Sequence, residues 1–140
     1  MSKINLGRVI LGGIVAGIII DAVEFVLNGI VLAPQWADLM QSFNRPAVGM
    51  NQIICFNIIG LLTGIAAVWT YAAIRPRFGA GVMTAAYAGL LIWLVGDALP
   101  DVSNMIAGLF PSNMTTMLVG VGLVELVAAT IAGAFVYKEA

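Results

Sequence analysis

Acidic and amide side chains recur at helical spacing inside long apolar stretches of this sequence. The first stretch carries Asp21, Glu24 and Asn28, and the third carries Asp97 and Asp101. Residues three or four positions apart share one face of an α-helix, so each set forms a polar stripe. Carboxyl and amide oxygens accept hydrogen bonds and bind cations. The stripes are therefore candidates for holding a small cation, a proton or a polar ligand.

The predicted site combines polar residues from four apolar stretches. At about 1.5 Å per residue, the acids of the first and fourth stretches fall near the middle of a bilayer, whereas those of the third fall near its outer surface. The cytoplasmic half of each stripe consists of glycine and alanine. This pattern predicts an acidic cavity that opens outward. Its ligand-binding residues are Asp21, Glu24, Asn28, Asn57, Trp93, Asp97, Asp101 and Glu125.

Structural explanations for the same residues stay open. Buried carboxyl groups can be protonated and hydrogen-bonded to neighbouring amides, and they then join helices without binding a ligand. Small residues at pairs such as Gly13/Gly17 and Gly60/Gly64 let helix backbones approach closely in lipid. These pairs are interpreted first as packing positions and second as a pore lining.

The sequence contains few residues that could bind a metal ion or act as a catalytic nucleophile. The sequence has no histidine, which removes the Glu-x-x-His motif of di-iron carboxylate sites. Asp21, Glu24 and Glu125 could offer only all-oxygen ligation, as Mg²⁺ or Ca²⁺ prefers. Cys55 has no base nearby in sequence and is interpreted as a packing residue. We predict no metal site and no catalytic residue, and the sequence identifies no cofactor.

Composition places these stripes in a membrane. The chain has 140 residues, of which 61% are hydrophobic and 9% are charged. A soluble domain carries about a quarter charged residues, so a soluble globule is excluded, and so is a disordered chain. A net charge of −1 without a basic run argues against nucleic-acid binding. The remaining class is an integral membrane protein.

The polar stripes lie on four predicted transmembrane helices in one domain, residues 1–140. A span needs roughly 20 apolar residues, and such runs occur at about 6–32, 52–74, 80–99 and 115–137. Pro76 and Gly79 predict a tight turn that ends the second helix. Pro100 either ends the third helix or only kinks it, in which case the helix continues as far as Leu109.

Aromatic residues are predicted at the membrane surfaces. Between Pro34 and Pro46, an apolar face that begins at Trp36 predicts a short amphipathic helix lying in the interface, with the indole at headgroup level. Tyr71 and Tyr137 fall at the cytoplasmic helix ends and are predicted to belong to the aromatic belt there.

Basic residues predict the orientation of the bundle. One side holds most of them, namely Lys3, Arg8, Arg75, Arg77 and Lys138, and the other holds Arg45 alone. Because cytoplasmic flanks retain Lys and Arg during insertion, both termini are predicted to be cytoplasmic.

Two segments resemble known sequences. The run from Trp69 to Gly81, WTYAAIRPRFGAG, and the ending from Val124 to Glu139 resemble a group of small bacterial four-helix membrane proteins of uncharacterised function, as does Asn28-Gly29. The resemblance implies a multi-pass protein of the bacterial inner membrane, with Glu125 within the fourth helix. It implies no established activity.

The sequence thus favours a non-enzymatic membrane role, which is binding or passage of a small cation, a proton or a polar ligand. Four short helices enclose little volume, so a transport role predicts a homo-oligomer assembled through the small-residue faces. The alternative is an accessory subunit of a larger membrane complex. A lipid-modifying enzyme is disfavoured because no nucleophile has a base beside it.

Overall fold

The fold consists of helices only. The computed structural model describes residues 3–139, and no strand occurs in that range. The elements in chain order are α1 (Leu6–Val26), η1 (Leu27–Val31), α2 (Ala33–Ser42), α3 (Met50–Phe78), α4 (Val82–Trp93), η2 (Leu94–Ala98), α5 (Leu99–Ile106) and α6 (Ser112–Val136). The elements η1 and η2 are single turns of π-helix.

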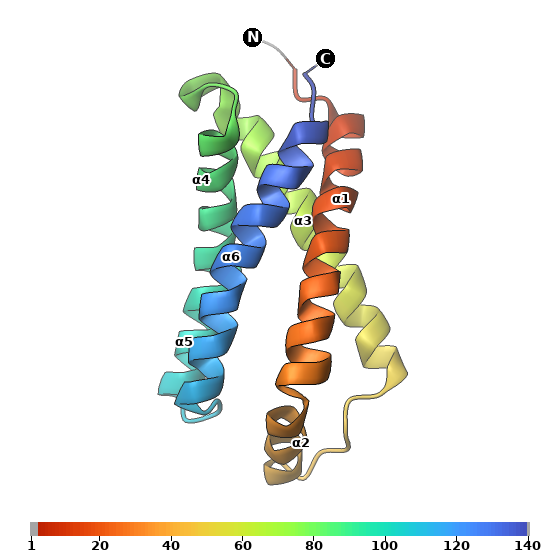
Figure 1. The fold of residues 1–140 in the computed structure, drawn as a ribbon, viewed down its shortest axis with the longest axis vertical. Helices are drawn as coiled ribbons and strands as arrows, with labels where there is room; N and C mark the ends of the chain where they lie inside the picture. The colour runs from red at the N-terminus through yellow and green to blue at the C-terminus, as the bar shows by residue number, and fades with distance from the viewer. Residues whose placement is uncertain (1–2, 140) are drawn as a thin grey trace.

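Four continuous helical segments are long and apolar enough to cross a membrane. They cover Leu6–Val31, Met50–Phe78, Val82–Ile106 and Ser112–Val136. The segments form a bundle in which both chain termini lie at the same end (Figure 1). The predicted all-α bundle of four spans is confirmed. The cytoplasmic location of the termini stays a prediction.

The second span is longer than predicted. Pro76 was expected to stop it, but α3 continues through Pro76 to Phe78. Proline removes one backbone donor and strains the preceding turn, yet only Arg77 and Phe78 follow it in the helix. The segment stays α-helical on both sides of Pro76. The helix ends at Gly79, whose φ of 87° suits glycine.

The third span continues across Pro100. The backbone N–H of Leu99 bonds to the carbonyl of Leu94 in the wider π-helical pattern. Because a proline ring clashes with the carbonyl four residues before it, here Gly96, the wider turn lets the helix accommodate Pro100. Of the two predicted alternatives, the kinked, continuous helix is the observed one, and α5 ends at Ile106 rather than Leu109.

Glycines bring the helices together in the half of the bundle near the termini. A Cβ added at Gly13 would collide with the backbone of Ile65, and one at Gly64 would collide with the backbone of Gly13 and Gly17. On the other side of α1, a Cβ added at Gly12 would collide with the carbonyl oxygen of Gly133 on α6, and one added at Gly133 would collide with that of Gly12. The small residues therefore pack α1 against α3 and α6 within one chain.

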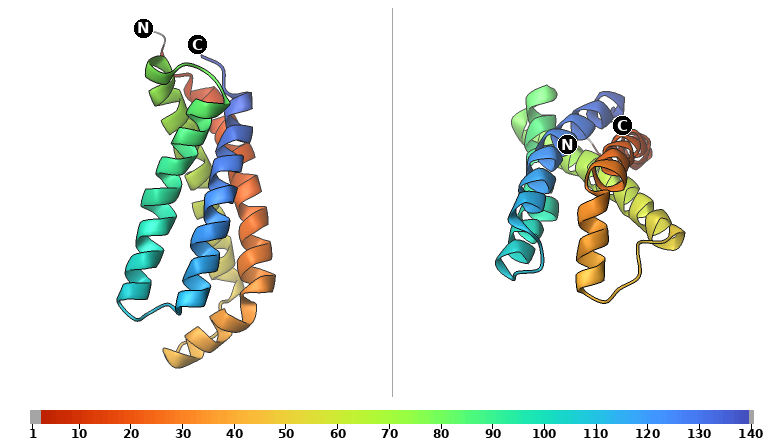
Figure 2. Two further views of the ribbon diagram at one scale, coloured as in Figure 1. Left: turned by 60° about the vertical axis from the view of Figure 1, so that its left-hand side comes forward. Right: turned by 60° about the horizontal axis from the view of Figure 1, so that its bottom comes forward.

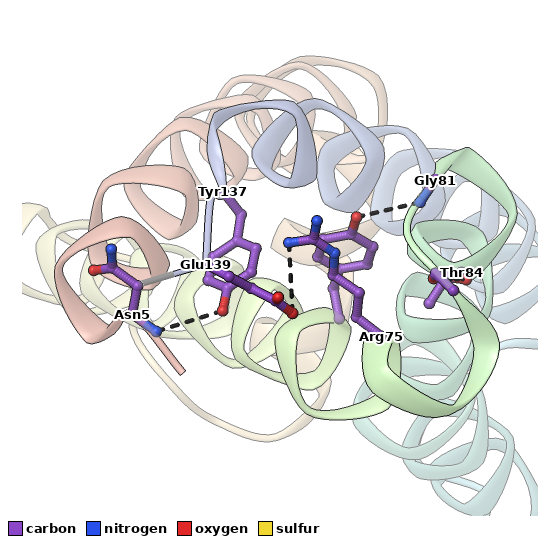
Figure 3. A network of polar contacts seen from close by, with 8 residues as sticks. Asn5, Arg75, Gly81, Thr84, Tyr137 and Glu139 are labelled. Atoms are coloured by element: carbon purple, nitrogen blue, oxygen red, sulfur yellow. Dashed lines mark hydrogen bonds and ion pairs between the residues drawn. The ribbon is translucent and has the colours of Figure 1, made fainter. Parts of the chain in front are cut away.

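Polar contacts join the helix ends beside the termini (Figure 3). Arg75 lies 3.7 Å from Glu139 and stacks over the ring of Tyr137 at 5.6 Å. The Tyr137 hydroxyl accepts a hydrogen bond from the backbone N–H of Asn5 at 3.4 Å. Tyr71 and Tyr137 meet edge to face and are each 5% exposed. Both tyrosines lie near helix ends, but their rings fill the space between the helices there and are not exposed as residues of an aromatic belt are.

The other end of the bundle is less compact. All ten residues from Met50 to Ile59 on α3 are exposed, and this part of the helix leans away from the others (Figure 1). The predicted short helix is present as α2, and it leaves the end of α1 at an angle (Figure 2). Leu32 and Leu39 pack with Met114 and Leu118 of α6 in a small apolar cluster.

Substitution of Gly64 tests the close packing. Gly64→Ala should destabilise the bundle by about 1–3 kcal/mol because the new methyl group collides with backbone atoms of α1. Gly120→Ala is the control, since a Cβ at exposed Gly120 meets no atom within 4 Å and alanine favours a helix. Thermal unfolding in detergent, followed by circular dichroism, measures both. Equal stability of the two variants would contradict this packing.

Candidate functional site

Glu24 and Glu125 face each other across the contact between α1 and α6. The two helices run antiparallel and approach closely at Gly12 and Gly133, so their side chains further along meet in register. The Glu24 and Glu125 carboxyl groups are close enough to interact directly. Glu125 is 5% exposed, and its Oε2 atom is buried without a hydrogen-bond partner. The pair forms the centre of the acidic cluster.

Two further acids reach this pair from the third span. The Asp97 carboxyl lies directly against Gly122, one turn before Glu125 on α6, where any Cβ would displace it. Its Oδ2 atom is also buried and unpaired. Asp101, one turn later, acts electrostatically on both Asp97 and Glu24. Acids from three spans therefore converge.

Asp21 lies at the edge of this group. Its carboxyl covers Gly60 on α3, where a side chain would overlap it. Asp21 also acts electrostatically on Glu24 and Glu125. We call Asp21, Glu24, Asp97, Asp101 and Glu125 the acidic cluster.

A chain of hydrogen bonds connects the cluster to α2. The Asn28 amide nitrogen donates to Oε2 of Glu24. The Trp36 indole nitrogen donates to Oδ1 of Asn28 at 2.8 Å. The Trp36 ring also meets Phe110 edge to face, with 5.7 Å between centroids. Trp36 was predicted to lie at headgroup level and was not among the predicted site residues. The eight residues from Asn28 to Trp36 include the bend at Leu32 between η1 and α2, so helical spacing could not reveal this contact.

Two predicted site residues have other surroundings. The Trp93 indole donates to the backbone carbonyl of Val119 at 2.9 Å and packs against the apolar core near the termini. It forms part of the wall between α4 and α6. Asn57 is exposed on the part of α3 that leans away, and the structure does not bring it to the acidic cluster.

Apolar side chains lie on both sides of the acidic cluster along the bundle axis. Toward the termini, Ile20 and Leu126 belong to the main core. Toward the opposite end, Leu27 and Leu118 belong to the second apolar cluster, which Trp36 and Phe110 cover. An opening along the axis at that end, as the sequence predicted, is thus closed by apolar residues. Asp21, Glu24 and Asp101 are partly exposed, so the cluster reaches the surface of the chain sideways.

The cluster has no basic partner and no metal-binding arrangement among the described residues. All six Lys and Arg residues of the chain lie toward the ends of the spans or in the connecting segments. Within residues 3–139, no three of the Asp, Glu and Cys side chains are grouped so that they could hold a metal ion. What the arrangement can exchange most directly is protons, between carboxyl groups that face one another.

Comparison with known protein families, curated proteins and solved structures finds no match for this chain. The resemblance to small bacterial four-helix membrane proteins therefore stays a prediction.

Trp93 offers a test of the wall between α4 and α6. Trp93→Phe removes the hydrogen bond to Val119 and should lower the free energy of unfolding by about 1 kcal/mol. Trp69→Phe is the matched control because Trp69 is 49% exposed, and it should change stability by less than about 0.5 kcal/mol. Unfolding in mixed detergent, monitored by helicity, measures the difference. A Trp93→Phe protein as stable as the control would place this indole outside the interface.

Proposed function

We propose that this chain is a non-enzymatic membrane protein that takes up and releases a proton, or binds a small cation, at the Glu24 and Glu125 pair. The observation that carries the proposal is the Glu125 side chain, which is 5% exposed, has an unpaired carboxyl oxygen and faces Glu24. Asp97 and Asp101, on the third span, are the next acidic residues in the direction of the proposed outer surface.

The physical reason is the cost of uncompensated charge. A charged side chain within a span costs about 2.5–3.5 kcal/mol on insertion scales, and neighbouring like charges repel. With no Lys or Arg beside them, these carboxyl groups gain stability by taking up protons or a cation. A proton fits better than a divalent metal ion, because the described acids do not group as metal ligands.

The proposed setting is the bacterial inner membrane, with both termini in the cytoplasm. The bias of Lys and Arg toward the end that holds the termini supports this orientation. In that orientation α2 lies at the outer surface, and the acidic cluster lies between it and the tightly packed cytoplasmic half.

Carbodiimide modification tests the proton site. Dicyclohexylcarbodiimide enters membranes and reacts with protonated carboxyl groups, so we expect it to modify Glu24 or Glu125 in proteoliposomes, as measured by mass spectrometry. Proton flux, followed with a trapped pH-sensitive dye, should fall at least tenfold in Glu24→Gln and Glu125→Gln proteins. Asp38→Asn is the control, since Asp38 is exposed on α2. Unchanged flux together with unmodified Glu24 and Glu125 would refute the proposal.

A role as one subunit of an assembly is the second candidate. The small-residue faces, through which the sequence predicted oligomers, are used inside the bundle. The segment from Met50 to Ile59 is instead the exposed surface. Asn57 lies about 10 Å along α3 from Met50, and no hydrogen bond from its side chain occurs among the described residues. A partner helix with a polar group at this depth would satisfy that amide.

The lone cysteine tests this surface in the intact chain. Cys55 is exposed on the same segment. If a second copy covers it, oxidation of membranes with copper phenanthroline should give a covalent dimer. The control replaces Cys55 by Ser and introduces Val124→Cys on α6, where Val124 is 69% exposed. Equal cross-linking at the two positions would indicate random collision and contradict a homo-oligomer through α3.

A further inference from the structure

The α2 helix covers the end of the bundle next to the acidic cluster. Leu39 of α2 is 9% exposed, and Leu32 just before α2 is fully buried. Both pack with Met114 and Leu118 of α6, and the Trp36 ring rests edge-on against Phe110. Figure 2 shows α2 turned away from the direction of α1 at this end. The helix thus closes the space beyond Glu24 and Glu125.

One side-chain hydrogen bond connects α2 to a spanning segment within residues 3–139. It runs from the Trp36 indole to the Asn28 amide oxygen, and the Asn28 amide nitrogen continues to Glu24. The other contacts of α2 with the bundle are apolar. The position of α2 is therefore coupled to the orientation of a carboxyl group in the acidic cluster through a single amide.

Both connections of α2 are suited to movement. The helix follows the π-helical turn η1, in which the regular hydrogen-bond pattern is already broken. It is followed by an exposed segment from Phe43 to Gly49 that lacks regular structure after Asn44. Helix distortions and exposed loops open at lower free energy than packed helix interiors.

We propose that α2 is a lid over the acidic cluster and that Trp36 is its latch. This inference rests on the proposed function, because the lid controls access from the outer surface to the pair that exchanges protons. In the latched state, Asn28 is held between Trp36 and Glu24, and the apolar layer excludes water from that side. Opening breaks the bond from Trp36, lifts Leu39 from α6 and lets water reach Glu24.

Thiol labelling measures opening of the lid directly. In a Cys55→Ser background, Leu32→Cys places a thiol beneath α2, where a water-soluble maleimide should react slowly. Adding Trp36→Phe keeps an aromatic ring against Phe110 but removes the indole N–H, so the labelling rate should rise at least fivefold. Ile20→Cys is the control, since Ile20 is 5% exposed in the core away from α2. Its labelling should be unaffected by Trp36→Phe.

Three results would overturn the lid. They are an unchanged rate at Leu32→Cys, a rise of equal size at Ile20→Cys, and labelling of Leu32→Cys that is fast with Trp36 intact. If Leu32→Cys does not fold, Leu39→Cys on the inner face of α2 replaces it with the same expectations. Maleimide labelling does not depend on proton binding. Unchanged proton flux in the Glu125→Gln protein, together with unmodified Glu24 and Glu125, would therefore refute the site alone, and equal labelling rates would refute the lid alone.

Discussion

Close contact between helix backbones at glycine positions holds α1 against α3 and α6 and fixes where their polar side chains meet. Lipid tails provide no hydrophobic drive between spans, so helices associate through close van der Waals packing. Gly13 and Gly64 bring α1 onto α3, and Gly12 and Gly133 bring it onto α6. Because these contacts set the register of two antiparallel helices, they place Glu24 opposite Glu125. A shift of one residue along either helix would rotate an acid toward lipid.

The two π-helical turns carry polar residues associated with the same cluster. Asn28 lies in η1 and Asp97 lies in η2. Pro100 follows η2 within one continuous helical segment, where its ring needs more room than a regular α-helix provides, whereas Pro34 lies in the first turn of α2 after the bend at Leu32. A π-helical turn also changes the direction in which side chains point. The two π-helical turns are thus places where polar groups turn toward the acidic cluster.

The acidic cluster and α2 form one physical system. Apolar layers separate the carboxyl groups from both ends of the bundle, and the main polar connection to the outer layer is the pair of hydrogen bonds through Asn28. The same low-dielectric surroundings that make unpaired acids costly also strengthen these bonds. A movement of α2 that breaks the bond from Trp36 would release the Asn28 amide that donates to Glu24.

Hydrophobic run length and the spacing of polar residues were sufficient to predict four spans, a short helix between the first two, and acids on the inner faces of α1 and α6. These features depend on helix periodicity and on the thickness of a bilayer, which act locally. Tertiary packing alone decided that Asn57 lies on an exposed surface, that Tyr71 and Tyr137 are buried, and that Trp36 bonds to Asn28. Those outcomes depend on how far α3 leans from its neighbours and on the direction that α2 takes after the bend at Leu32, and neither leaves a periodic signal in the residues concerned.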